Sequence, residues 1–310
     1  MYSHNKDIVC MGEAMVEFTR IESQKDDAVY IRGLGGDTSN CAIAAARQGA
    51  DVAYLSAVGE DQFGRIAMEK WSDEGIDVSH VSIDPDAPTG IYFIEPAPEG
   101  RNFTYYRNDS AATKMTLSDA SHSLLSRTAI LHISAITQAI SSAARGSAFN
   151  AIEIVKQSGG KVSYDTNLRL NLWGLEEARS VINETAAKAD ILLPSLDEAQ
   201  TLTGLDNKED VIEFYLKFKP DILVLKCGSE GAIVVCGGEK KVIPALEVSA
   251  VDTSGAGDTF AGAFLARIVQ GESPFEGARF AVVAAGSSVQ GYGAVTPIPN
   301  RKQVLKALAN

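Results

Sequence analysis

The sequence contains few of the residues that build metal centres and disulfide frameworks. Its 310 residues include four cysteines and four histidines. No C-x-x-C pair occurs among the cysteines, which are Cys10, Cys41, Cys227 and Cys236. Apolar stretches typical of buried free thiols surround three of them, Cys10, Cys41 and Cys236. The histidines form no metal motif, and we expect His132 to be a buried strand residue rather than a base. These patterns argue against a zinc or disulfide scaffold.

Basic residues are outnumbered by acidic ones, with 28 Lys and Arg against 40 Asp and Glu and a formal net charge of -12. This balance argues against broad electrostatic attraction to nucleic acid or an anionic membrane. We find no 18-residue apolar run and no signal-peptide pattern, so we expect no membrane partner and a cytoplasmic location. An anionic substrate would have to be held by a few local arginines.

Both standard nucleotide-binding fingerprints are missing as well. No G-x-x-x-x-G-K-[ST] motif occurs, and the glycine-rich segment at 33–38 lacks the last glycine of the dinucleotide pattern. What is present is Asp-Thr-Ser-Gly-Ala-Gly-Asp at 252–258, followed by a small-residue, apolar run that predicts a helix. Such a turn brings backbone N–H groups and the helix N-terminus to an anion. With Asp258 beside it, the turn has the groups needed to move a phosphoryl group onto an alcohol, although a simply capped glycine turn would read the same way.

Short apolar segments alternate with helical patterns along the chain. This alternation predicts a parallel sheet covered on both faces by helices. The expected strands are 8–11, 52–58, 129–133, 162–165, 191–193 and 222–225, and the expected helices are 39–48, 61–74, 142–157, 175–187, 196–203 and 211–218. A helical pair at 257–270 and 275–288 follows.

Two segments interrupt the alternation and predict a small β-lid at about 13–36 and 89–108. Residues 29–32 read as a strand, and 91–95 and 102–107 read as a hairpin about 96–100. Because alternate strand residues share a face, Phe103, Tyr105 and Arg107 should project together while Tyr106 points away. That face could cover a small anion, or it could simply pack the hairpin.

Four further polar segments follow predicted strands or open predicted helices: residues 35–40, 165–169, 194–198 and 225–231. Each alone could be a cap or a turn. Because ligands bind outside the carboxyl ends of parallel strands, we expect all four to meet the 252–258 turn at one edge of the sheet.

Taken together, these motifs resemble the ribokinase-like (PfkB) carbohydrate kinases over essentially the whole chain. Within that family the chain looks most like the 2-keto-3-deoxygluconate kinases. The closer match rests on the motifs at 35–40, 89–92, 105–107, 165–173 and 289–294. The resemblance implies a single kinase domain over 1–310, an α/β three-layer sandwich with a mostly parallel central sheet and the β-lid. It also implies ATP and Mg²⁺ as cofactors and phosphorylation of a sugar's primary hydroxyl.

The resemblance also implies roles for individual residues. Asp258 would be the base, with the N–H groups of Gly255, Ala256 and Gly257 as the anion hole. Residues implied for the nucleotide are Asn167, Arg169, Lys226, Gly228, Ser229, Gly231, Gly255 and Gly257. Residues implied for the sugar are Gly35, Gly36, Asn40, Tyr92, Tyr105, Arg107, Arg169 and Asp258. Glu198 matches the acidic end of the family's magnesium motif, whose asparagine is Ser195 here. We expect Asp258 to stay ionised near neutral pH because it lies at a helix N-terminus.

Arg107 and Arg169 favour a 2-keto-3-deoxy sugar acid, because guanidinium groups make charge-assisted contacts with a carboxylate. Arg107, on the lid beside Tyr105, is the stronger indication, since Arg169 could instead hold ATP. Fructose or another neutral ketose is the alternative, and a non-catalytic sugar-binding regulator is a remote one. The residues do not distinguish gluconate- from galactonate-derived acids, nor do they decide whether a monovalent cation such as K⁺ binds beside Asp252. The aromatic lid predicts a homo-oligomer, a dimer or higher, formed through the β-lid.

Overall fold

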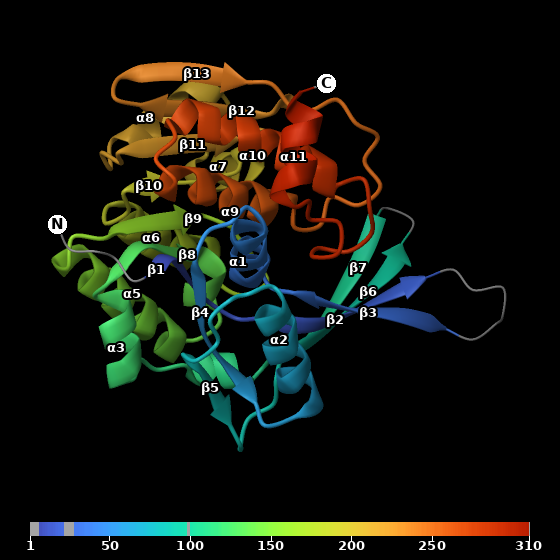
Figure 1. Ribbon diagram of the computed structural model, residues 1–310. Coiled ribbons are helices and arrows are strands. Elements are labelled where there is room, and N and C mark those ends of the chain that lie inside the picture. The colour runs from blue at the N-terminus through green and yellow to red at the C-terminus, as the bar shows by residue number, and fades with distance from the viewer. Residues whose placement is uncertain (1–5, 22–27, 98–99, 310) are drawn as a thin grey trace.

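The computed structural model describes residues 6–21, 28–97 and 100–309 (Figure 1). In this part of the chain, nine strands form the main sheet in the order β13-β12-β11-β10-β9-β8-β1-β4-β5. The strands are β1 (Lys6–Met11), β4 (Val52–Gly59), β5 (Val81–Asp84), β8 (Thr128–Ser134), β9 (Lys161–Asp165), β10 (Ile191–Leu192), β11 (Ile222–Lys226), β12 (Ala232–Cys236) and β13 (Glu239–Ile243). All neighbouring strands run parallel except for the antiparallel edge made by β11, β12 and β13. The predicted α/β class is confirmed.

Helices cover both faces of this sheet. They are α1 (Asp37–Arg47), α2 (Gln62–Asp73), α3 (Asp119–Leu125), α4 (Ala135–Ala139), α5 (Ser142–Gln157), α6 (Leu175–Ala186), α7 (Leu196–Thr203), α8 (Lys208–Leu216), α9 (Ala256–Val269), α10 (Pro274–Ser288) and α11 (Arg301–Leu308). Two short 3₁₀ turns, Ala111–Lys114 and Gly228–Glu230, complete the list.

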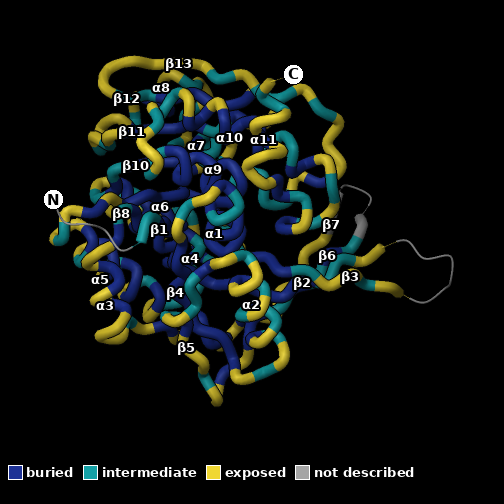
Figure 2. The backbone as a smooth tube through the Cα atoms, viewed as in Figure 1, coloured by how far each residue is buried: buried dark blue, intermediate teal, exposed yellow. Residues whose placement is uncertain are grey.

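The alternation of side chains along β1 explains the three layers. Ile8 and Cys10 face a core that includes residues of α1, α2, α9, α10 and α11. Val9 and Met11 face a second core with residues of α3, α5, α6, α7 and α8. Because both faces of the strand are covered, β1 is apolar on both sides, and the sheet forms the buried centre of the molecule (Figure 2).

A smaller sheet extends to one side of the main body (Figure 1). Its order is β3-β2-β6-β7, made of β2 (Met15–Ile21), β3 (Val29–Gly35), β6 (Ile91–Ala97) and β7 (Gly100–Tyr106). We call this four-stranded sheet the lid. The predicted strand at 29–32 and the predicted hairpin are both present, and residues 98–99 of the expected hairpin turn lie outside the described residues.

Several elements were not predicted individually. Among them are β2, β5, β12, β13 and helices α3, α4 and α11. The helix expected at 211–218 begins earlier, at Lys208, because the side chain of Asn207 caps it by accepting a hydrogen bond from the Glu209 N–H at 2.8 Å. Within the described ranges, no helix combines the length and apolarity that a membrane crossing requires.

The buried polar and thiol residues largely match the expectation. His132 is buried in β8, where its Nδ1 lies 3.1 Å from the Ser163 hydroxyl. Cys10 and Cys41 are buried free thiols, whereas Cys236 is only partly buried because β12 lies near the edge of the sheet.

Candidate active site

The 252–258 turn leads directly into α9 at the carboxyl edge of the main sheet. Gly255 has φ 71°, a left-handed conformation that disfavours any other residue, and it precedes the first residue of the helix. Asp252 anchors the turn by accepting hydrogen bonds from the N–H groups of Ser254 (3.0 Å) and Gly293 (2.8 Å). The N-terminus of α9 therefore stands in a fixed position, with Asp258 in its first turn.

Helix α1 packs unusually closely against α9, and this contact brings Asn40 to Asp258. A Cβ added to Gly262 would lie 2.2 Å from the carbonyl oxygen of Cys41, so only glycine allows this approach. The Asn40 side chain then donates a hydrogen bond of 2.8 Å to Asp258 Oδ2. Asn40 is itself buried, and its Oδ1 has no hydrogen-bond partner among the described residues.

Asp258 is only partly ionised near neutral pH, contrary to the expectation from the sequence. Burial raises the pKa of the Asp258 carboxyl to about 7, and the nearby carboxylate of Asp37 adds to the rise. The Asn40 hydrogen bond and the charge of Lys226 oppose the rise, while Asp165 adds to it. The desolvation and the like charges thus outweigh the helix dipole. A carboxyl that titrates near pH 7 is well matched to proton transfer at that pH.

A cavity of about 450 Å³ opens in front of Asp258. The main body and the lid both contribute to its walls. It is lined by Glu13, Met15, Glu17, Gly36, Asp37, Asn40, Tyr92, Ile94, Phe103, Tyr105, Arg107, Ile136, Asn167, Arg169, Asn171, Ser254, Gly255, Asp258 and Ala294. Most of the residues that the sequence predicted for the sugar therefore meet in one place. Gly35 does not line the cavity but supports it, since a Cβ there would lie 2.0 Å from the Tyr92 hydroxyl oxygen.

The lid presents its predicted aromatic face to this cavity. Tyr92 and Tyr105 are stacked with ring centroids 5.6 Å apart, and Phe103 stacks on Tyr105 at 6.2 Å. The Arg107 guanidinium lies 5.8 Å from the centre of the Tyr105 ring. Tyr106 points to the other face, where it packs edge-on against Phe93, as the period of the strand predicts.

Arg107 already has a carboxylate partner. Its Nη2 donates to Glu13 Oε2, and the two side chains are only 10% and 1% exposed. Ser110 Oγ donates a second hydrogen bond of 2.7 Å to Glu13 Oε1. Arg107 Nε is buried and has no partner in the part of the chain that the structure describes. Arg107 therefore lies in the cavity wall with much of its charge balanced.

Arg169 is the more accessible of the two arginines. Its side chain is 45% exposed, and Nη1 pairs with Glu198 Oε1 at 2.8 Å. Burial would lower the pKa of Arg169, but the Glu198 carboxylate and more distant acids raise it. The two predicted functional residues Arg169 and Glu198 are thus directly linked.

Glu17 is a cavity residue that the sequence analysis did not identify. It is buried on β2, where Tyr92 Oη donates a short hydrogen bond to Glu17 Oε2 and Thr19 Oγ1 donates one of 2.8 Å to Oε1. The alternating pattern Met-Val-Glu-Phe-Thr at 15–19 contains part of the signal, because Glu17 shares a face of the strand with Met15, and both residues line the cavity.

A second cavity of about 470 Å³ lies on the other side of the α9 N-terminus. It is lined by Lys226, Gly228, Ser229, Gly231, Ala245, Leu246, Glu247, Val248, Ala250, Thr253, Ala256, Gly257, Phe260, Val282, Ala285, Gly286 and Val289. Lys226 reaches it from the end of β11 and pairs with Asp165 at 2.5 Å. Ala256 and Gly257 line this cavity while Gly255 and Asp258 line the first, so the glycine turn separates the two. Asn167 and Arg169, predicted for the nucleotide, line only the first.

The described residues include no cluster of three or more acidic, histidine or cysteine side chains arranged to hold a metal ion. Glu198 nevertheless has an unusual environment. Its Oε2 is buried without a hydrogen-bond partner in the described ranges, and burial raises the pKa of this carboxyl. Ser195, in the place of the family's asparagine, is the N-cap residue of α7.

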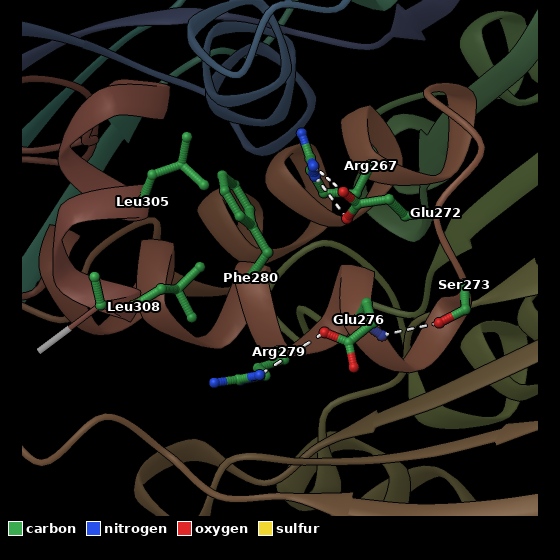
Figure 3. Close-up of a pocket in the computed structure, with 9 residues that line it drawn as sticks. Arg267, Glu272, Ser273, Glu276, Arg279, Phe280, Leu305 and Leu308 are labelled. Atoms are coloured by element: carbon green, nitrogen blue, oxygen red, sulfur yellow. Dashed lines mark hydrogen bonds and ion pairs between the residues drawn. The ribbon is translucent and has the colours of Figure 1, made fainter.

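A third cavity, also of about 470 Å³, lies between α9, α10 and α11 (Figure 3). Its charges are paired locally, Arg267 with Glu272 and Arg279 with Glu276. It shares no lining residue with the other two cavities. This hollow therefore adds nothing to the candidate site.

Comparison with known proteins agrees with this arrangement. The profile of the pfkB family carbohydrate kinases matches residues 5–301. The chain is 33% identical to fructokinase-1 of Oryza sativa subsp. japonica, over 97% of each chain. It is also 33% identical to the 2-dehydro-3-deoxygluconokinase of Thermoproteus tenax, over 97% of this chain and 94% of that one.

Solved structures give the same result. Vibrio cholerae fructokinase, determined in a fructose, ADP and calcium ion bound form, superposes with a TM-score of 0.85 at 27% identity, covering 97% of this chain and 98% of that one. A double mutant of that enzyme has been determined with fructose, ADP and potassium ion, at the same identity and TM-score.

Proposed function

Because the chain belongs to the pfkB family of carbohydrate kinases, we propose that it phosphorylates the primary hydroxyl of 2-keto-3-deoxy-D-gluconate with ATP. The product is 2-keto-3-deoxy-6-phosphogluconate. One observation carries the proposal: a glycine turn at a helix N-terminus stands between two cavities, with a carboxyl that titrates near pH 7 on one side.

The chemistry follows from this arrangement. The sugar hydroxyl approaches Asp258, which accepts its proton as the oxygen attacks the γ-phosphorus and the bond to the β-phosphate oxygen breaks. The N–H groups of Gly255, Ala256 and Gly257 stabilise the charge on the phosphoryl oxygens. Phosphoryl transfer depends mainly on position and charge neutralisation, and both are built into the rigid turn.

The second cavity suits the nucleotide. Gly228 and Gly231 (φ 57° and 96°) and Ser229 leave a wall without bulky side chains, and Lys226 supplies positive charge at the end nearest the glycine turn. Asn167, on the sugar side, is the residue we assign near the transferred phosphate.

Glu198 suits a hydrated magnesium ion, because its buried Oε2 has no protein partner in the described residues and Mg²⁺ prefers oxygen ligands and retains water. Mg²⁺ bound to ATP would neutralise phosphate charge. A monovalent cation beside Asp252 remains a prediction, to which the potassium-bound fructokinase gives support.

The lid and the loop after β9 supply the groups for the acid. Tyr105, Arg107 and Arg169 line the same cavity, and the Arg107 guanidinium lies 5.8 Å from the centre of the Tyr105 ring. Burial raises the pKa of the Tyr105 hydroxyl, and the charges of both arginines oppose that rise. A hydroxyl and two guanidinium groups in one cavity wall can hold a carboxylate through charge-assisted hydrogen bonds. Of the two, Arg169 offers the larger accessible surface.

A neutral ketose such as fructose is the second candidate, and two observations favour it. Glu13 already balances the charge of Arg107, and Glu17 places a further buried carboxylate in the cavity. Carboxylates accept hydrogen bonds from sugar hydroxyls but repel a sugar acid. A non-catalytic regulator is the least favoured alternative, because Asp258 and the glycine turn are intact.

A coupled ADP-release assay with 2-keto-3-deoxygluconate, its galactonate-derived epimer and fructose tests the proposal. We expect the highest kcat/KM with the gluconate-derived acid. Arg169→Ala should raise the KM for the acid by about tenfold or more and leave the KM for fructose nearly unchanged. Arg32→Ala is the control, because Arg32 pairs with Phe18 and so lies on the opposite face of the lid. Equal use of fructose by the wild type and by Arg169→Ala, with no preference for the acid, would overturn the sugar-acid proposal.

We also propose that two or more copies associate through the lid. Ile31, Val29 and Phe103 on its cavity face are 54%, 41% and 45% exposed, an unusual amount of open apolar surface for one small sheet. Light scattering at micromolar protein should give at least twice the chain mass, and Ile31→Glu should reduce it; a monomeric wild type contradicts the proposal.

A further inference from the structure

Four backbone segments connect the lid to the main body. They are the link from β1 to β2, the link from β3 to α1, the segment before β6 and the segment after β7. The hinge of the lid is therefore made of four short segments, at residues 12–14, 35–36, 88–90 and 107–110. A residue that contacts all four segments, through its side chain or its backbone, can set the angle of the lid over the cavity.

Glu13 is that residue, and its side chain makes the contacts with the third and fourth segments. It lies in the first segment and accepts hydrogen bonds from Arg107 and Ser110, which lie at the two ends of the fourth. A Cβ added to Gly90, in the third, would lie 2.9 Å from Glu13 Oε1. In the second, a Cβ on Gly36 would lie 2.4 Å from the Glu13 carbonyl oxygen. The hinge is packed so closely around Glu13 that both glycines are sterically required.

The charge of Glu13 makes this contact strong and specific. The pair with Arg107 is almost completely shielded from water, with side chains 1% and 10% exposed, so its attraction is screened little. Arg107 in turn lies over the ring of Tyr105, which stacks on Tyr92 in the cavity wall. A displacement of Arg107 therefore moves the wall that faces Asp258.

We propose that Glu13 is a positioning residue that locks the hinge and holds the aromatic face of the lid at the correct distance from Asp258. This inference rests on the proposed function only in assigning the sugar to the cavity in front of Asp258. The nucleotide cavity has no lining residue from the lid strands, so the lock should act on the sugar and not on ATP.

Three variants test the lock. Glu13→Gln keeps the size of the side chain but removes its charge, and Ser110→Ala removes one hydrogen bond while the ion pair remains. The matched control is Glu74→Gln, which weakens the ion pair between Glu74 and Arg47. These two side chains are also largely shielded, at 13% and 17% exposed, and neither lines the sugar cavity or the nucleotide cavity. The readouts are KM for the best sugar, KM for ATP, kcat and hydrogen exchange of the amides of β6 and β7.

We expect Glu13→Gln to raise the sugar KM by about tenfold and Ser110→Ala by about threefold, with the ATP KM changed less than about twofold in both. Glu74→Gln should leave both KM values unchanged. Hydrogen exchange in β6 and β7 should accelerate in Glu13→Gln and not in the control.

Three outcomes would overturn the inference: the sugar KM of Glu13→Gln is unchanged, its ATP KM rises as much as its sugar KM, or Glu74→Gln shows the same effect. If Glu13→Gln does not fold, Ser110→Ala decides the matter alone. If the wild type phosphorylates no sugar, the proposed function fails, while hydrogen exchange still tests whether Glu13 holds the lid.

Discussion

Replacing Asp258 with asparagine should make the protein less active and, above neutral pH, more stable. Burial and the nearby acids raise the pKa of this carboxyl from 3.8 to about 7 in the folded chain. The folded state therefore holds the proton more tightly than the unfolded state. Stability from this group is complete below about pH 4, falls between pH 4 and 7, and stays low above pH 7. Asparagine carries no charge and avoids that loss.

The shift in pKa sets the size of the effect. A rise from 3.8 to about 7 corresponds to a ceiling of about 4 kcal/mol at 1.36 kcal/mol per pKa unit. Because Asp258 still faces the open cavity, we expect roughly half of that, about 2 kcal/mol. In a chain of this size such a change moves the melting temperature by roughly 4 °C.

Thermal melts of the wild type and Asp258→Asn at pH 5 and pH 8 measure this. The variant's advantage in melting temperature should grow by about 2 °C from pH 5 to pH 8, because the carboxyl of the folded wild type ionises between them while that of the unfolded chain is already ionised at pH 5. Turnover should fall on the order of 10²–10⁴-fold in the same variant. A melting-temperature difference that is independent of pH, or a variant less stable at pH 8, would refute the reasoning on the pKa.

Three further predictions concern the neighbours of this carboxyl. With both substrates below their KM values, wild-type kcat/KM should rise with pH through a midpoint near 7 and level off about one pH unit above it. Asn40→Ala removes a hydrogen bond to the ionised form of Asp258 and should move that midpoint up by about one pH unit. An unmoved midpoint contradicts this prediction. Lys226→Ala removes the ion pair with Asp165 and should raise the KM for ATP by about tenfold or more, while the KM for the sugar stays the same. Steady-state kinetics with each substrate varied in turn measures both values. Gly262→Ala puts a methyl group 2.2 Å from a carbonyl oxygen of α1, so we expect a lower melting temperature together with a lower kcat. A fully active and equally stable variant would show that α1 and α9 can move apart without loss of stability or activity.

The fold was largely predictable because its signals are local. Apolar runs and helical periods identified most strands of the parallel sheet, and the strand period correctly placed Tyr105 and Arg107 on one face of the lid, with Tyr106 on the other. The glycine turn alone could be a capped turn, and its role was recognisable because it occurs together with the other motifs of the pfkB carbohydrate kinases. Short strands such as β5 and the edge hairpin of β12 and β13 were missed, because their few residues resemble loops.

The electrostatics of the site could not be read from the sequence. The raised pKa of Asp258 depends on its burial and then on Asp37, which lies 221 positions earlier in the chain and is brought near by the packing of α1. The pairing of Arg107 with Glu13 also joins distant segments. In each case the partner is set by tertiary contacts, so a list of charged residues shows which groups are present but not which of them neutralise one another.

The glycine turn between the two cavities has a consequence for inhibitor chemistry. A compound that fills only the second cavity contacts none of the lid residues, so the proposed function gives it no means of distinguishing one sugar kinase from another. Selectivity requires a molecule that also enters the first cavity on the other side of the turn and reaches Arg169. A bisubstrate compound that occupies both cavities would distinguish enzymes by the sugar they accept.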